Sequence, residues 1–90
     1  MVIVAALRTA TCKARRGGLA GVTADDLLAT LFKAVFERTG VPPGAVGDVV
    51  IGSVLGPSSQ RANEARIAMF LASMPQEVPV HTVNRQCSSG

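Results

Sequence analysis

The chain has 90 residues, 48% of them hydrophobic, which corresponds to one small folded unit and excludes a disordered chain. With three phenylalanines and neither tryptophan nor tyrosine, its core must consist mainly of aliphatic side chains. The formal net charge is +3, and because no aromatic residues are interleaved with the basic ones, nucleic acid is disfavoured as a partner.

The first predicted element is an apolar run over residues 2–7, which favours a β-strand buried on both faces. This run is too short to cross a bilayer, and no basic leader precedes it, so we expect neither a membrane segment nor secretion. In an intracellular, reducing compartment Cys12 and Cys87 are expected as free thiols rather than as a disulfide. Cys12 is predicted to be a small buried residue or a loop residue.

A polar, glycine-rich loop follows over residues 8–22. Its glycines lack the G-x-G-x-x-G spacing of a dinucleotide site, so a flexible connection is favoured. The loop also carries a basic cluster of Lys13, Arg15 and Arg16. We interpret this cluster as a solvated surface, and the alternative is attraction of a polyanionic ligand such as a phosphorylated cofactor.

The first predicted helix begins at Thr23, whose hydroxyl can cap an unpaired N–H group, and ends at Gly40. Pro42 and Pro43 prevent its continuation. One face of this helix carries an apolar stripe that should enter the core. The stripe consists of Leu27, Leu28, Leu31, Phe32, Val35 and Phe36.

A second strand is predicted from Asp48 to Leu55, where Gly52 and Ser53 are small enough to let another part of the molecule approach closely. A break at residues 56–59 separates it from a second helix. This helix should run from about Asn63 to Ser73, with its apolar side in the core or, alternatively, against a partner. That side is predicted to consist of Ile67, Met69, Phe70 and Leu71.

The third predicted strand, about Val80 to Asn84, delivers Cys87 to a turn of small residues. Such a turn suits a nucleophile, because a helix beginning there would direct its N–H groups at the sulfur. In the 90 residues alone, however, we expect Ser88, Ser89 and Gly90 to form a disordered terminus. His81 lies on the same face as Cys87 but about 20 Å away along the strand, so we expect a structural or surface role for it. About three strands and two helices in a βαβαβ order predict an α/β fold.

The segment Val83-Asn84-Arg85-Gln86-Cys87-Ser88-Ser89-Gly90 resembles the acyl-enzyme motif of thiolases. The Arg-Gln pair before the cysteine is most similar to the peroxisomal type of 3-ketoacyl-CoA thiolase. Further similar segments occur in the family's order: Arg8-Thr9-Ala10, Arg16-Gly17-Gly18, residues 23–28, residues 47–56, and residues 65–68 followed by Pro75. The resemblance implies that residues 1–90 form an incomplete N-terminal thiolase domain, a partial layered α/β domain that ends at the nucleophile turn.

The resemblance also implies an acyltransferase of fatty-acid β-oxidation, which cleaves 3-ketoacyl-CoA with CoA into acetyl-CoA and a shortened acyl-CoA. Cys87 would be the nucleophile that carries the acyl group as a thioester. The supporting turn would consist of Asn84, Arg85, Ser88, Ser89 and Gly90. CoA would act as a co-substrate, with no permanently bound cofactor and no metal.

The family's Gly-His-Pro and Cys-x-Gly segments, which supply the general base and a second cysteine, have no counterpart in these 90 residues. We therefore predict that the 90 residues alone are inactive. The expected partners are acyl-CoA and CoA, with a homodimer for the full protein, in the peroxisome or another intracellular compartment such as the cytosol or mitochondrion. Two alternatives are a truncated product that docks on intact thiolase subunits and a thiolase-related condensing enzyme.

Overall fold

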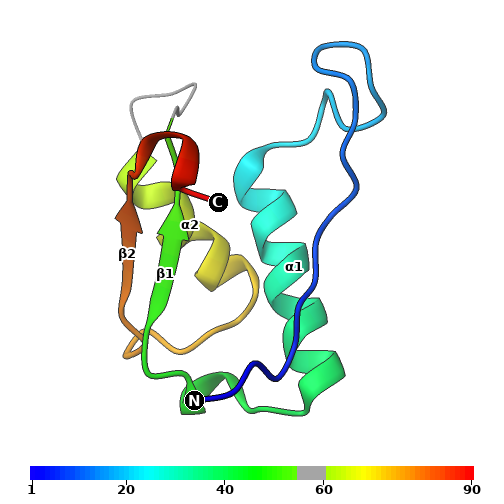
Figure 1. The fold of residues 1–90 in the computed structure, drawn as a ribbon. Helices are drawn as coiled ribbons and strands as arrows, with labels where there is room; N and C mark the ends of the chain where they lie inside the picture. Colours follow the sequence, from blue (N-terminus) through cyan, green and yellow to red (C-terminus); the bar gives the residue numbers. More distant parts are fainter. Residues whose placement is uncertain (55–60) are drawn as a thin grey trace.

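The computed structural model describes residues 1–54 and 61–90, and of residues 61–63 it describes the backbone alone. The elements are, in chain order, helix α1 (Ala24–Thr39), a 3-10 turn (Pro43–Ala45), strand β1 (Val49–Gly52), helix α2 (Arg61–Leu71), strand β2 (Val80–Val83) and a second 3-10 turn (Gln86–Ser88). The two strands are parallel, with Val49 opposite Val80 and Gly52 opposite Val83 (Figure 1). The predicted α/β class is confirmed.

The predicted first strand is wrong, so the described residues contain two strands rather than three. Residues 1–10 have no regular secondary structure, and the side chains of Val2, Ile3 and Val4 are 82%, 88% and 73% exposed. This segment runs along α1 (Figure 1). A strand needs a neighbouring strand to receive its backbone hydrogen bonds, and among the described residues none lies beside this segment.

Helix α1 has the predicted bounds, although its first residue is capped differently. The carbonyl of Thr23 accepts the N–H of Leu27 at 3.2 Å, but the Thr23 hydroxyl donates to Oδ2 of Asp26 at 3.0 Å and caps no backbone group. A cap would need the Thr23 oxygen to accept a backbone N–H of the first turn, and the structure shows no such bond. At the other end Gly40 takes a left-handed conformation, φ 69°, and its N–H donates to the carbonyl of Phe36 at 2.9 Å.

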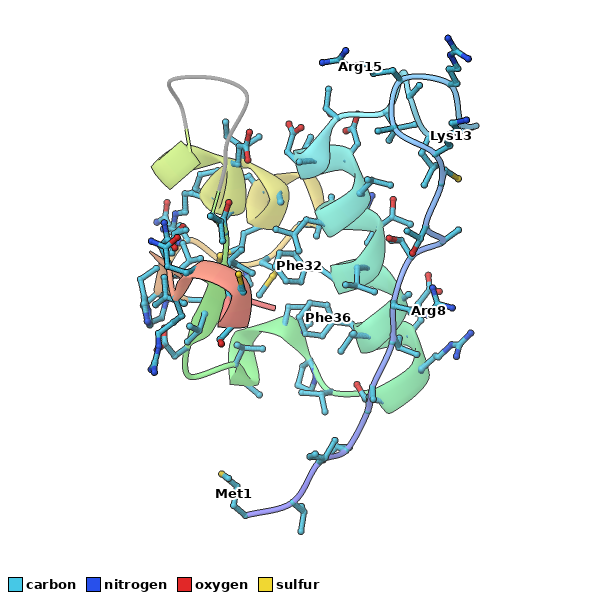
Figure 2. All side chains as sticks on the ribbon, turned by 45° about the horizontal axis from the view of Figure 1, so that its top comes forward. Met1, Arg8, Lys13, Arg15, Phe32 and Phe36 are labelled. Atoms are coloured by element: carbon cyan, nitrogen blue, oxygen red, sulfur yellow. The ribbon has the colours of Figure 1, made fainter. Side chains whose placement is uncertain are left out.

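The core lies between the two helices and the sheet. Phe32 and Phe36 project from α1 toward α2 and the strands (Figure 2), and they pack on the cluster of buried side chains together with Leu28. Met69 of α2 is fully buried at the centre of this cluster. The other buried members are Ala29, Val49, Ala68, Ala72, Met74 and Val78. The predicted role of the α1 stripe is thus confirmed for Leu28, Phe32 and Phe36, whereas Leu27, Leu31 and Val35 are half-buried outside this cluster.

The apolar side predicted for α2 is wrong except for Met69. Ile67, Phe70 and Leu71 are exposed, and the buried face consists of Ala65, Ala68, Met69 and Ala72. These residues follow the i, i+3, i+4, i+7 spacing of one helix face. Small side chains on that face let α2 approach its neighbours closely, which larger side chains would prevent. The helix also begins two residues earlier than predicted, and the predicted break at residues 56–59 lies outside the described residues.

The connection from α2 to β2 is held by one side chain. Arg66 donates from Nη1 to the carbonyl of Val78 at 2.6 Å and from Nη2 to the carbonyl of Gln76 at 2.5 Å. Its guanidinium also lies over the ring of Phe70, 4.9 Å from the ring centre. Two carbonyls of the loop are therefore paired with a charged donor, which fixes the approach of the chain to β2.

Candidate active site

The candidate nucleophile lies in a tight turn at the end of β2. Cys87 is a free, exposed thiol within the 3-10 turn Gln86–Ser88. Two backbone bonds close this turn: the N–H of Ser88 donates to the carbonyl of Arg85, and the N–H of Ser89 donates to the carbonyl of Gln86, both at 3.1 Å. The predicted disordered terminus is therefore not what the structure shows. The turn presents the sulfur at its surface.

The residue before the cysteine has an unusual backbone conformation. Gln86 has φ 52°, in the left-handed region that residues with a side chain rarely adopt. Its N–H donates to Oδ1 of Asn84 at 2.9 Å, and its carbonyl accepts the Ser89 hydroxyl at 2.8 Å. The same Ser89 oxygen accepts the N–H of Arg85 at 2.8 Å. These side-chain bonds offset the cost of the bend, which is of order 1 kcal/mol.

The structure thus brings Asn84, Arg85, Ser88 and Ser89 together around Cys87 as one hydrogen-bonded turn. Within the described part of the chain, the closing bonds leave out the backbone N–H of Cys87. A donor at this position can stabilise negative charge on the oxygen of an acyl group that the sulfur carries. The catalytic role of these residues remains a prediction from the sequence.

The turn also touches the end of the neighbouring strand. A Cβ atom placed on Gly52 would overlap the carbonyl oxygen of Ser89 and lie 2.6 Å from its carbonyl carbon. The close approach predicted at Gly52 is therefore present, and the approaching segment is the nucleophile turn. Beside it, the N–H of Ser53 donates to the carbonyl of Val83 at 2.9 Å, which ties the ends of the two strands together.

A cavity of about 280 Å³ lies next to this contact, between α1, β1 and α2. Gly52 and Ser53 belong both to its wall and to the strand end that meets the turn. Most of its lining is aliphatic, and Glu64 is its charged member. The other lining residues are Thr9, Ala24, Leu27, Leu28, Leu31, Ile51, Ala65 and Thr82. The sequence did not indicate this cavity, because segments far apart in the chain form its wall.

His81 lies away from the turn, on the exposed face of β2. Its Nδ1 is 3.6 Å from Oδ1 of Asp48, and both side chains are about half exposed. Asp48 Oδ1 also accepts the N–H of Val49 at 2.9 Å, so the aspartate is held at the start of β1. The surface position agrees with the structural or surface role predicted for His81.

The basic cluster and the second cysteine lie in the loop before α1. Lys13 and Arg15 project outward from this loop (Figure 2), and Cys12 is a free, exposed thiol. The loop position predicted for Cys12 is confirmed, and the buried alternative is wrong. Over the described residues no group of three or more His, Cys, Asp or Glu side chains is placed to hold a metal ion, and no helix is both long and apolar enough to span a membrane.

Comparison with known proteins decides the family. The family model described as "Thiolase, N-terminal domain" matches residues 1–90 of the chain. The chain belongs to the thiolase family. Among curated thiolases, it is 61% identical to 3-ketoacyl-CoA thiolase 5, peroxisomal, of Arabidopsis thaliana, over all 90 residues. It is 47% identical to the human 3-ketoacyl-CoA thiolase, peroxisomal, again over its whole length. The sequence resemblance is therefore confirmed.

The fold of this thiolase chain is also found among solved structures. The crystal structure of the Bacillus anthracis acetyl-CoA acetyltransferase matches 99% of the chain with a TM-score of 0.87 and 34% sequence identity, and the match covers 22% of that protein. The chain spans 20% of the Arabidopsis relative and 21% of the human one. The 90 residues thus correspond to about a fifth of the thiolases that they resemble.

Proposed function

We propose that this chain supplies the nucleophile of a 3-ketoacyl-CoA thiolase, with Cys87 as the residue that accepts the acyl group. The observation that carries the proposal is the turn itself: an exposed thiol follows a parallel strand and is fixed by Asn84 and Ser89. The names of the similar curated proteins support the same reaction, since they are 3-ketoacyl-CoA thiolases.

In the proposed reaction the Cys87 thiolate attacks the 3-keto carbon of the substrate. The bond between C2 and C3 breaks, the electron pair goes to C2, and protonation at C2 gives acetyl-CoA. The shortened acyl group stays on the sulfur as a thioester. The thiolate of a second CoA then attacks this thioester and releases the shortened acyl-CoA, which returns Cys87 to its thiolate form.

A sulfur nucleophile suits both halves of this reaction, because a thiolate attacks carbonyl carbons and also leaves readily from a thioester. The family's acid and base segments, Gly-His-Pro and Cys-x-Gly, do not occur in these 90 residues. We therefore propose that turnover needs residues beyond the present chain. CoA is the proposed co-substrate, a homodimer the proposed assembly of the complete enzyme, and the peroxisome the proposed location, in line with the names of the relatives.

A chimera tests this function. The 90 residues would replace the matching segment of the Arabidopsis relative, and the product would be incubated with a 3-ketoacyl-CoA carrying a labelled acyl chain. We expect the label on the peptide that contains Cys87, trapped before CoA is added, and none on Cys12. Cys87→Ala should abolish both label and turnover, whereas Cys12→Ala should leave both unchanged. Full turnover by the Cys87→Ala chimera would refute the proposal.

A further inference from the structure

Gly52 lies on β1, 35 positions before Cys87 in the sequence, yet it contacts the turn that carries the candidate nucleophile. Its φ is not in the left-handed region, so its backbone conformation does not require glycine. A glycine within a strand lowers the stability of the folded protein by about 0.5–1 kcal/mol relative to alanine. The reason for glycine at this position is therefore space, and the segment that occupies the space is the carbonyl group of Ser89.

Ser89 connects this contact to the cysteine. Its carbonyl oxygen lies where the Cβ atom of a Gly52 side chain would be, and its carbonyl carbon lies 2.6 Å from that position. Its hydroxyl accepts the N–H of Arg85 and donates to the carbonyl of Gln86, each at 2.8 Å. Both bonds act on the two residues directly before Cys87. A displacement of Ser89 would therefore be passed to the bend at Gln86 and to the sulfur.

We propose that Gly52 is a positioning residue for Cys87. The Ser89 backbone packs directly on the backbone of Gly52, and the Ser89 hydrogen bonds fix the turn that orients the sulfur. The effect of Gly52 on catalysis rests on the proposed function, whereas the packing of Ser89 on Gly52 does not depend on it. An added methyl group must move the Ser89 backbone, which is less able to shift than the end of a flexible side chain. A misplacement of about 1 Å at a reacting group can reduce a rate by about 100-fold.

The first test measures the turn in the 90-residue protein by amide hydrogen exchange. In Gly52→Ala the amides of Ser88 and Ser89, which close the turn, should exchange at least about tenfold faster, while the sheet amides of Val49 and Ser53 keep their rates. Gly47→Ala is the matched control, because nothing lies within 4 Å of a Cβ at Gly47. Loss of protection throughout the sheet, or no change at the turn, would overturn the proposal.

A second variant removes the hydrogen bonds of the Ser89 hydroxyl without adding an atom at Gly52. Ser89→Ala deletes the hydroxyl and leaves the Ser89 carbonyl in contact with Gly52. It should also speed hydrogen exchange at the amide of Ser88 and leave exchange at the amide of Val49 unchanged. Combined with Gly52→Ala, it should add little, because both changes release the same turn. Fully additive effects would show that Gly52 does not act through Ser89, and the proposal would fail.

The third test measures acyl transfer in the chimera. Gly52→Ala should lower kcat about 100-fold with KM nearly unchanged, since it displaces the sulfur rather than removing a binding contact. Gly47→Ala should keep the parent rate. Unchanged kcat in Gly52→Ala would reject the positioning role. If the parent chimera itself places no label on Cys87, the proposed function fails. The hydrogen-exchange measurements then still decide whether Gly52 fixes the position of the turn.

Discussion

The N-terminal segment, residues 1–10, and the C-terminal region, residues 80–90, differ in what surrounds them (Figure 1). Strand β2 pairs with β1 along its whole length, and its Val80 packs against the core. The N-terminal segment has no strand beside it among the described residues, and its Val2, Ile3 and Val4 side chains are exposed. Both regions are rich in β-branched residues, so the neighbour, and not the composition, decides which of them forms a strand.

The largest expected effect separates the core from the N-terminal segment. Met69→Ala removes a fully buried side chain and should lower the free energy of unfolding by about 2–5 kcal/mol. Ile3→Ala alters a side chain that is 88% exposed and should change it by less than about 0.5 kcal/mol. Urea unfolding followed by circular dichroism measures both. A comparable loss in Ile3→Ala would show that the N-terminal segment is packed in solution.

Hydrogen exchange compares the backbones of the two regions directly. The N–H of Val49 donates to Pro79 and that of Ser53 to Val83, at 3.0 and 2.9 Å, so both amides should be protected. The amides of Ile3 and Val4 should exchange about 100-fold faster relative to their intrinsic rates. Exchange read by NMR provides the measurement. Equal protection at both places would mean that residues 1–10 find a pairing partner.

A smaller effect is expected from the side chain that fixes the path into β2. Arg66→Lys removes the forked pairing with Gln76 and Val78 and should cost about 1–2 kcal/mol of stability. Arg8→Lys is the control in the N-terminal segment, where Arg8 makes a local, exposed bond of 3.4 Å to Thr9, and should cost almost nothing. Thermal unfolding of the two variants would test this, and equal shifts would contradict it.

The smallest expected effect concerns the exposed pair across the two strands. His81→Gln removes the contact with Asp48 and keeps the bond that the Val49 N–H donates to Asp48, so stability should change by less than about 0.5 kcal/mol. Urea unfolding measures the difference, and a loss above about 1 kcal/mol would assign His81 a packing role in the sheet.

Local chemistry made part of this fold predictable. Gly40 ends α1 where a left-handed residue is needed, and the α1 stripe follows from residues three and four positions apart. The buried face of α2 was not predictable by hydrophobicity, because alanines are selected there for the small gap between elements. The absence of a side chain at Gly52 predicts that another segment approaches β1 closely, but only the fold shows that this segment is Ser89. Partners distant in sequence leave no local signal.

The alanine face of α2 has a consequence for how this sequence can vary. Ala65 and Ala68 are almost completely inaccessible, so a random library under selection for folding should retain only the smallest residues at those two sites. Ile67 and Leu71, on the opposite side, should accept nearly any substitution that continues a helix. Mutational tolerance along α2 would then run opposite to side-chain size, with its tiniest residues the hardest to replace.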